Sequence, residues 1–268
     1  MAKSSPTCWP DGPCALLVER GPIESLGPMT EPTEPSPPLI LFSGLASDAT
    51  VFASQVTAFP ALIVPTWPMP AKKETLSQYC QRIAETILPQ TPCIIGGVSF
   101  GGIVALELAR YTNPVAIVLI GSIRSPREMP WRARIFRPLA PLMPFLPVKF
   151  IQDISGTLLA RPVRAAFPNL ANFVELARDA ERRTLRWSLQ QLLQWRNESL
   201  PKCPIYQIHG DRDIVFPISC TQPETIVRGG GHLISMTHPN EVNAFLKKCL
   251  QAHTSQAVEP SPSSVTSS

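Results

Sequence analysis

The chain has 268 residues, of which 44% are hydrophobic and 16% charged, and its formal net charge is +4. This length suits one large domain, or a core with an inserted lid. The modest charge argues against a nucleic-acid-binding protein. No apolar run approaches the roughly 20 residues of a membrane-spanning helix, and the first residues lack the basic and apolar regions of a signal peptide.

Both ends of the chain have the composition of poorly ordered segments. Nine of the 31 prolines lie in the first 38 residues, and serine and threonine dominate the other end. We therefore expect a poorly ordered, proline-rich segment over 1–37 and a disordered serine-rich tail over 252–268. The seven cysteines have no Cys-x-x-Cys spacing. This pattern favours free thiols and a cytoplasmic location.

Short apolar runs alternate with helical patterns between these ends. The predicted strands cover residues 39–42, 61–64, 93–98, 115–120, 205–209 and 225–227. The predicted helices cover about 76–88, 100–110 and 240–250. Strands that are almost continuously apolar and alternate with helices predict an α/β fold with a doubly wound, mostly parallel sheet.

Residues 123–200 interrupt this alternation, because they contain helical patterns without a convincing strand. We expect a helical cap here, inserted between the core segments 38–122 and 201–251. The insertion holds 13 basic and 6 acidic residues. These charges either form a solvated helix face or attract an anionic substrate. The better candidate contacts follow directly after a predicted strand and are Arg124, Arg127, Arg132, Arg134 and Arg137, of which Arg124 and Arg127 are the first two. Its apolar run, 139–151, either shapes an acyl pocket or packs the cap onto the core.

Ser99 stands in a Gly-x-Ser-x-Gly pattern between the strand at 93–98 and a helix. In this context the pattern predicts a nucleophile elbow, a sharp turn that lifts the serine hydroxyl clear of the sheet. Gly97 and Gly101 suit the turn because a Cβ at either position would collide with the adjoining strand and helix. The alternative is an incidental serine in a glycine-rich turn, and the presence of a base decides between the two.

Four histidines are candidates for that base. His232 follows three glycines and the last predicted strand, so its imidazole can project over the strand ends beside Ser99. His238 precedes the last helix and is the chief competitor. We interpret His209, at the end of a strand, as structural, and His253 as part of the tail.

The acid of a Ser-His-Asp triad should lie between the serine and the histidine in this chain order. Asp211 and Asp213 both follow the strand at 205–209, at the edge of the sheet where catalytic groups gather. Asp213 precedes an apolar stretch and is the better partner for His232. Asp211 is better explained as a turn residue, although either aspartate is able to serve.

A negative oxygen in a tetrahedral intermediate needs N–H donors, and we expect two backbone amides to supply them. One is that of Phe100, directly after the proposed nucleophile. The other comes from the loop after the first strand, where Leu45 is preferred over Ala46. This chemistry requires neither a metal nor an organic cofactor.

Together these motifs resemble the α/β-hydrolase fold superfamily over about residues 38–250. The resemblance rests on the elbow, on the order Ser, Asp, His, and on Ser-Gly-Leu at 43–45, Gly-Asp-Arg-Asp at 210–213 and Gly-His-Leu at 231–233. It implies a core sheet with a helical cap at 123–200. It also implies that Ser99 is the nucleophile, Asp213 the acid and His232 the base.

The chain departs from that family at the first loop, where members often have His-Gly and this sequence has Ser43-Gly44. The serine removes an imidazole from the mouth of the site, which either changes the substrate or leaves room for a side-chain hydroxyl donor. The segment between Asp213 and the last predicted strand is also short, which places the chain among compact members.

Three functions fit these features. The leading hypothesis is a serine hydrolase that cleaves an ester or thioester through an acyl-enzyme. The second is a non-hydrolytic enzyme of the same fold, an acyl transferase or a lyase or synthase acting on a carboxylate substrate. The third is a non-catalytic small-molecule binder, against which the complete set of triad residues counts. In each case the expected partner is a small molecule, and the basic cap favours an anionic one.

Overall fold

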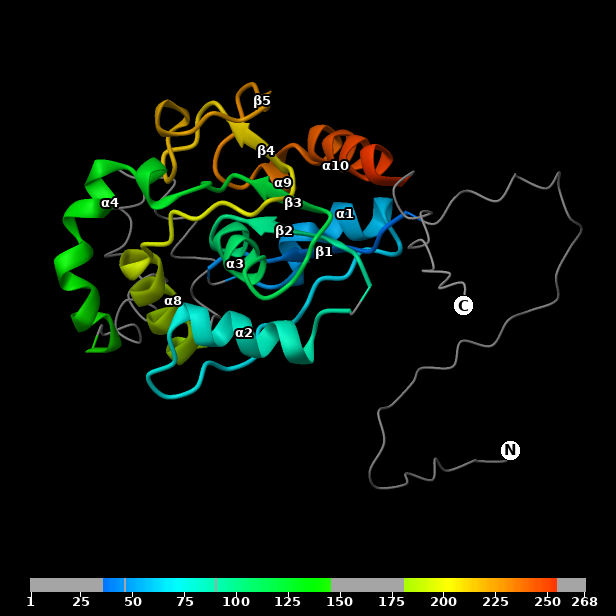
Figure 1. The fold of residues 1–268 in the computed structure, drawn as a ribbon. Helices are drawn as coiled ribbons and strands as arrows, with labels where there is room; N and C mark the ends of the chain where they lie inside the picture. The colour runs from blue at the N-terminus through cyan, green and yellow to red at the C-terminus, as the bar shows by residue number, and fades with distance from the viewer. Residues whose placement is uncertain (1–35, 46, 90, 146–180, 255–268) are drawn as a thin grey trace, which may run out of the picture. The chain divides into compact units, whose positions relative to one another are not determined.

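The computed structural model describes residues 36–45, 47–89, 91–145 and 181–254. These residues contain a five-stranded, all-parallel sheet with helices on both faces, which confirms the predicted α/β class (Figure 1). The strands, which are neighbours in chain order, are β1 (Leu39–Phe42), β2 (Ile94–Val98), β3 (Ala116–Ile120), β4 (Ile205–Gly210) and β5 (Thr225–Val227).

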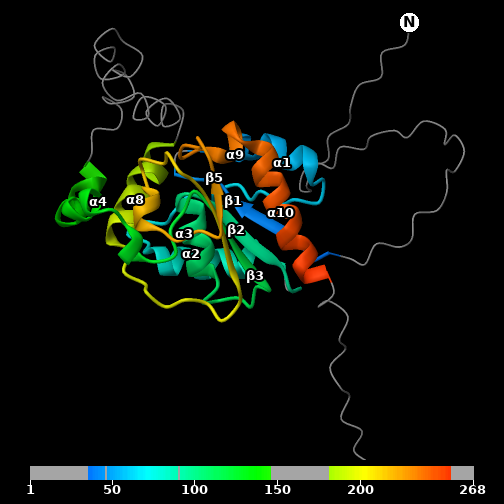
Figure 2. The ribbon, with the colours of Figure 1, turned by 90° about the horizontal axis from the view of Figure 1, so that it is seen from above.

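Each face of the sheet has its own apolar core, because successive side chains of a strand point to opposite faces. Ile40 and Phe42 of β1 pack with the helices α2 (Leu76–Thr86) and α3 (Phe100–Leu108). Leu39 and Leu41 belong to the opposite core, together with α10 (Pro239–Thr254). Figure 2 shows α2 and α3 on one side of the strands and α10 on the other, with α1 (Ala53–Ala58) beside it.

The remaining described elements are helical. They are η1 (Ala49–Phe52), η2 (Pro126–Glu128), α4 (Trp131–Ile135), η3 (Arg137–Phe145), α8 (Arg182–Gln194), η5 (Ile218–Cys220) and α9 (Ile234–Thr237). None of the helices within the described ranges combines the length and apolar composition needed to cross a membrane.

Two sequence predictions need correction. The strand predicted at 61–64 is reduced to a single parallel bridge between Ile63 and Ile40. Pro60 and Pro65 flank this segment, and proline cannot donate a hydrogen bond to a neighbouring strand, so pairing does not extend. The last helix continues to Thr254, three residues into the predicted tail. The predicted disorder of 1–35 and 255–268 lies outside the described residues.

The strand connections diverge at the carboxyl ends of β1 and β2. After β1 the chain continues to the bridge at Ile63, on the far side of β1 from β2. After β2 it continues in the opposite direction, to β3. Adjacent strands whose connections diverge leave space beyond their carboxyl ends, which is where ligands bind in open α/β sheets. The loop at 43–45 and the turn at Ser99 lie at these two ends.

The described residues of the predicted cap are joined to the core by two tryptophans. Trp187 of α8 packs 4.5 Å from Tyr79 of α2 and 6.3 Å from Phe100, measured between ring centroids. The indole N–H of Trp195 donates to buried Glu107 of α3 over 2.9 Å. Residues 146–180 lie outside the described part, so a complete helical cap stays a prediction.

The buried Trp195–Glu107 bond should contribute to stability. Replacing Trp195 with Phe removes one donor from a buried carboxylate, which typically costs about 1.5–3 kcal/mol. We expect a loss of this size in the free energy of unfolding, measured with urea. Trp131→Phe, at an exposed tryptophan, is the matched control and should change stability by less than about 0.5 kcal/mol. Equal effects of the two substitutions would contradict this role.

Candidate functional site

Ser99 occupies a strained turn between β2 and α3. Its backbone has φ 53° and ψ −119°, in a region that L residues rarely adopt. The turn is possible because the chain segments around it approach unusually closely. A Cβ added at Gly101 would lie 2.2 Å from the carbonyl oxygen of Phe42, and one at Gly97 would lie 2.5 Å from the same oxygen. Only glycine therefore fits at either position.

Polar groups beneath the turn hold it in place. The amide of Ser99 donates to the carbonyl oxygen of Ile120 over 3.0 Å. The hydroxyl of buried Ser122 donates to the carbonyl oxygen of Ser99 over 2.7 Å. Gln207 of β4 in turn donates its side-chain amide to the Ser122 carbonyl oxygen, also over 2.7 Å. No sequence pattern marks Ser122 or Gln207, because their roles depend on contacts between strands.

The structure brings Ser99, His232 and Asp213 together in one hydrogen-bonded chain. Nε2 of His232 lies 2.8 Å from Oγ of Ser99, and Nδ1 lies 2.8 Å from Oδ2 of Asp213. An ionised Asp213 only accepts hydrogen bonds, so Nδ1 of His232 is the donor. In the neutral imidazole Nε2 is then an acceptor, and the Ser99 hydroxyl donates to it. This tautomer can remove the serine proton.

Asp213 is a buried carboxylate that accepts hydrogen bonds at both oxygens. Oδ1 accepts from the amides of Val215 and Phe216, over 2.8 and 3.0 Å. Oδ2 accepts from His232 and lies 3.2 Å from Nε2 of His209. Burial opposes ionisation, but hydrogen bonds from His209 and His232 outweigh it and hold the pKa of Asp213 well below its usual value. Asp213 therefore stays ionised when His232 takes a proton.

His209 places a second imidazole next to the Asp213 carboxylate. From the sequence, His209 is expected to be only structural. Its Nε2 lies 2.7 Å from the carbonyl oxygen of Phe216, which can only accept, so this nitrogen carries the proton. The side chain is fully buried, and Nδ1 has no hydrogen-bond partner in the described part of the chain. His209 thus positions Asp213 and the segment leading to Phe216. The signal in the sequence was a strand-end histidine four residues before Asp213.

The competing candidates lie elsewhere. The Asp211 carboxylate accepts a hydrogen bond from the amide of Gly229 over 2.7 Å, so it braces the loop before His232. His238 bonds through Nδ1 to the hydroxyl of Thr237. Nε2 of His253 lies 3.2 Å from the hydroxyl of Tyr206. Within the described ranges, none of these three side chains forms a hydrogen bond or ion pair with Ser99.

The two amides expected to bind an oxyanion flank the turn. Phe100 is the first residue of α3, so its N–H has no partner within the helix. The loop before Leu45 lies against the elbow, since a Cβ added at Gly44 would be 3.5 Å from Cβ of Ser99. The Leu45 amide makes no backbone hydrogen bond to any described residue. Ala46, the second choice, lies outside the described residues.

Of the two alternatives for Ser43, the structure argues against its own hydroxyl as a donor to a ligand. The buried Ser43 hydroxyl donates its only proton to the carbonyl oxygen of Ser47 over 2.9 Å. It also accepts the indole N–H of Trp67 over 2.6 Å. Because both contacts are internal, Ser43 supports the loop and has no proton to offer a ligand.

Two of the candidate anion contacts, Arg124 and Arg127, are paired with carboxylates. Arg124 forms an ion pair with Glu224. The Glu224 carboxylate also accepts a hydrogen bond from the backbone amide of Gln207. Exposed Arg127 forms an ion pair with Glu198 over 2.6 Å. An anionic substrate would therefore have to compete with Glu224 for Arg124 and with Glu198 for Arg127.

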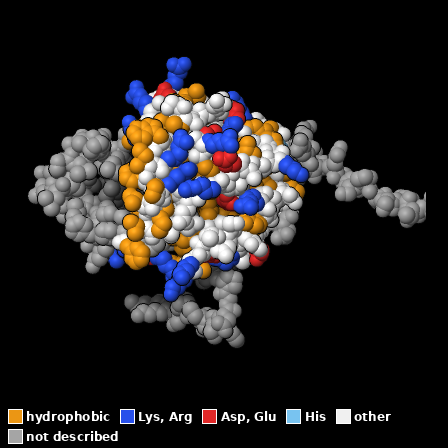
Figure 3. All heavy atoms as spheres, turned by 60° about the vertical axis from the view of Figure 1, so that its left-hand side comes forward, with side chains coloured by type: hydrophobic (Ala, Val, Ile, Leu, Met, Phe, Trp, Pro, Cys, Tyr) orange, Lys and Arg blue, Asp and Glu red, His pale blue; other side chains and the backbone are white. Residues whose placement is uncertain are grey.

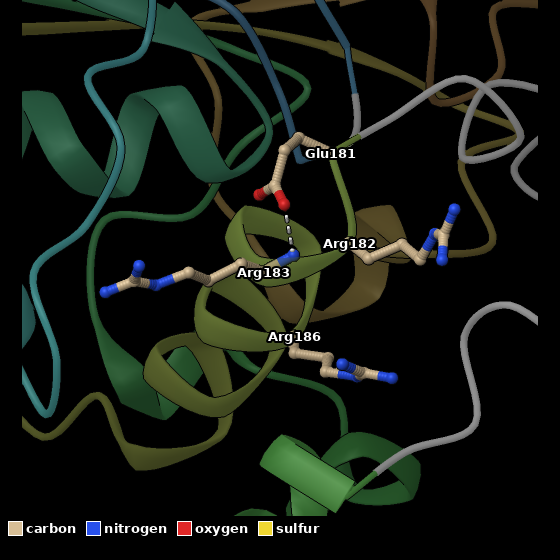
Figure 4. Close-up of a pocket in the computed structure, with 4 residues that line it drawn as sticks. All are labelled: Glu181, Arg182, Arg183 and Arg186. Carbon is tan, nitrogen blue, oxygen red and sulfur yellow. Dashed lines mark hydrogen bonds between the residues drawn. The ribbon is translucent and has the colours of Figure 1, made fainter.

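A pocket of about 400 Å³ lies at the start of α8, and none of its lining residues is Ser99, Asp213 or His232. It is lined by Glu181, Arg182, Arg183 and Arg186 (Figure 4). The Glu181 carboxylate caps the helix by accepting the amides of Arg183 and Thr184. Within the described ranges, no three His, Cys, Asp or Glu side chains form a group that could hold a metal ion.

Comparison with known proteins agrees with this architecture. The model of the alpha/beta hydrolase family matches residues 39–245 of this chain. No curated protein matches the chain by sequence.

Several solved structures share the fold. An esterase from Thermogutta terrifontis is 18% identical with a TM-score of 0.58, and the match covers 82% of this chain and 92% of that one. An enol-lactonase from Burkholderia xenovorans is 14% identical with a TM-score of 0.59, covering 82% and 94%. An epoxide hydrolase from Bacillus megaterium is 11% identical with a TM-score of 0.55, covering 80% and 93%. At these identities the likeness shows the fold and not the substrate.

The close approach at the elbow should make Gly101 intolerant of a side chain. Gly101→Ala places a Cβ against two backbone carbonyl oxygens, which should lower the free energy of unfolding by about 1–3 kcal/mol. Gly231→Ala is the control, because no atom lies within 4 Å of a Cβ added there. Thermal unfolding should separate the two variants, and a Gly101→Ala protein as stable as Gly231→Ala would refute the packing argument.

The lowered pKa of Asp213 predicts how stability depends on pH. Its ionised form stabilises the folded state at any pH above the unfolded value of about 3.9, and this contribution is lost as the pH falls toward the lower folded-state pKa. Between about pH 5 and pH 3, the wild type should lose about 1 kcal/mol more stability than Asp213→Asn. Urea unfolding at both pH values measures this, and parallel losses would show that the carboxylate is not stabilised.

Proposed function

This chain belongs to the α/β-hydrolase family, and from that membership we propose that it is a serine hydrolase that cleaves an ester or a thioester. The observation that supports the proposal is the hydrogen-bonded chain from Ser99 through His232 to Asp213, with 2.8 Å at each step. In this proposal Ser99 is the nucleophile, His232 the general base and Asp213 the acid.

The proposed reaction has two halves. Oγ of Ser99 attacks the substrate carbonyl carbon while its proton moves to Nε2 of His232, and the amides of Leu45 and Phe100 donate to the resulting oxyanion. The intermediate collapses to an acyl-enzyme, and His232 gives its proton to the departing alcohol or thiol. Water then attacks the acyl-enzyme with His232 again as base, which releases the acid and restores Ser99.

Burial of Asp213 suits this cycle. Its lowered pKa keeps a negative charge beside His232, so the imidazolium formed in each half is stabilised without proton transfer to the carboxylate. The short segment from Asp213 to Phe216 and the contact with His209 fix the carboxylate in direction. The protein thereby needs little rearrangement when charge develops on His232.

The similar structures include an esterase, an enol-lactonase and an epoxide hydrolase, so the shared fold serves several classes of substrate. The described cysteines are all free thiols, which is consistent with the predicted cytoplasmic location.

A fluorophosphonate probe with peptide mass spectrometry tests the nucleophile. We expect labelling at Ser99 that is lost in Ser99→Ala and His232→Ala, because both remove the activated hydroxyl. His238→Ala is the matched control and should be labelled like the wild type. On an ester and thioester panel, Ser99→Ala should lower kcat by about 10⁴–10⁶-fold without unfolding the protein.

Two outcomes would contradict the proposal. Near-normal turnover by folded Ser99→Ala would remove the nucleophile assignment. Turnover that depends on Ser99 but forms no acyl-enzyme would instead support the non-hydrolytic lyase or synthase.

A further inference from the structure

The segments α4 and η3 expose large apolar side chains. Six of the 14 large apolar side chains exposed in the described residues lie within residues 131–145. The most exposed are Trp131 at 62%, Ile135 at 61% and Phe145 at 82%. Leu139 and Leu142 are also exposed, so these members of the predicted apolar run do not pack the cap onto the core. Monomeric proteins rarely leave such a cluster without a partner.

The inner side of the same segment is made of smaller or polar groups. Ala140 is buried, and Ala133 packs against the core. Arg137 is partly buried and donates toward the carbonyl oxygen of Pro126 over 3.4 Å. A helix that only covers a core directs its large apolar side chains inward. Here the arrangement is reversed, so the exposed side chains are not explained by packing within the described chain.

Positive charge accompanies this apolar surface. Arg132 and Arg134 are exposed, and no acidic residue occurs between Glu128 and Asp153. The guanidinium of Arg132 lies 5.8 Å from the ring centroid of Trp131. The pKa of Arg137 is lowered, mainly by burial and also by the positive charges of Arg196 and Arg134. Figure 3 shows a band of apolar side chains along this edge, with Lys and Arg side chains beside it.

We propose that the α4–η3 surface, defined by Trp131, Arg132, Arg134, Ile135, Phe136, Leu139, Leu142 and Phe145, docks onto an anionic phospholipid surface. Tryptophan and other large apolar side chains enter the boundary between headgroups and acyl chains, and flanking arginines attract anionic headgroups. A second copy of the chain is a poorer partner, because two such surfaces would bring like charges together.

The place of this surface in the fold suits a protein that meets its ligand at a membrane. The chain reaches α4 from the carboxyl end of β3, and Ser99 follows the carboxyl end of neighbouring β2. The candidate site lies at this edge of the sheet. Docking would therefore hold the candidate site close to the lipid. The inference does not depend on Ser99 being a nucleophile.

Co-sedimentation of the full chain with lipid vesicles tests the inference. The wild type should bind vesicles of phosphatidylcholine mixed with phosphatidylglycerol more tightly than vesicles of phosphatidylcholine alone. Trp131→Ser with Phe145→Ser should weaken binding to both by at least about tenfold, because buried apolar area is lost. Arg132→Gln and Arg134→Gln should each weaken binding to the anionic vesicles about fivefold.

Controls distinguish vesicle binding by this surface from nonspecific vesicle binding and from catalysis. Ile226→Ser and Arg228→Gln change an exposed apolar and an exposed basic residue at β5, and both should bind like the wild type. Ser99→Ala should also bind vesicles normally, so a failed catalytic proposal leaves this test intact. Circular dichroism verifies that each variant is folded.

Three results would overturn the inference. Binding that is unchanged in the Trp131 and Phe145 double variant would place the lipid contact elsewhere. Concentration-dependent dimers that disappear in that variant, without vesicle binding, would identify a second copy as the partner. Absence of both vesicle binding and dimers would mean that the surface is covered by the chain itself.

Discussion

The close approach of β1, β2 and α3 around Ser99 is the constraint on which the rest of the structure depends. The carbonyl oxygen of Phe42 lies so near Gly97 and Gly101 that neither position accepts a Cβ. This proximity brings the loop after β1 against the elbow and forces Ser99 to the positive φ of 53°. The strain is held by backbone pairing with β3 and by the buried Ser122 hydroxyl. A side chain held this way can be aimed at a ligand without first reorganising.

A buried carboxylate provides the second fixed point. Asp213 would be costly to bury alone, but two amides and the imidazole of His232 donate to it, and the imidazole of His209 lies 3.2 Å away, so the ionised form is the stable one. The turn around Asp211 and the glycines that follow β5 bring His232 to this carboxylate. The geometry of the candidate site therefore comes from two separate loops, each anchored to the sheet, and not from flexible side chains that meet in solvent.

The insertion between β3 and β4 has two different surfaces. Toward the core, Trp187 and Trp195 place apolar rings and indole donors against α2 and α3. Toward solvent, α4 and η3 place large apolar side chains among arginines. Core contacts of the first kind stabilise the fold, whereas the second kind costs solvation free energy unless something covers it. This contrast within one insertion is the reason to assign the α4–η3 surface to a partner.

The sequence by itself determined the fold class and most strand positions, because apolar runs, glycines and helix caps are local signals. It also ranked Ser99, His232 and Asp213 above their competitors. The catalytic roles of these three residues stay predictions. Tertiary structure decided what depends on packing between distant segments: His209 beside Asp213, Ser122 beneath the elbow, the internal bonds of Ser43, and the carboxylate partners of Arg124 and Arg127. It also reduced the strand at 61–64 to one bridge, since flanking prolines limit pairing. Such partners are separated by many residues, and no local pattern encodes which of them meet.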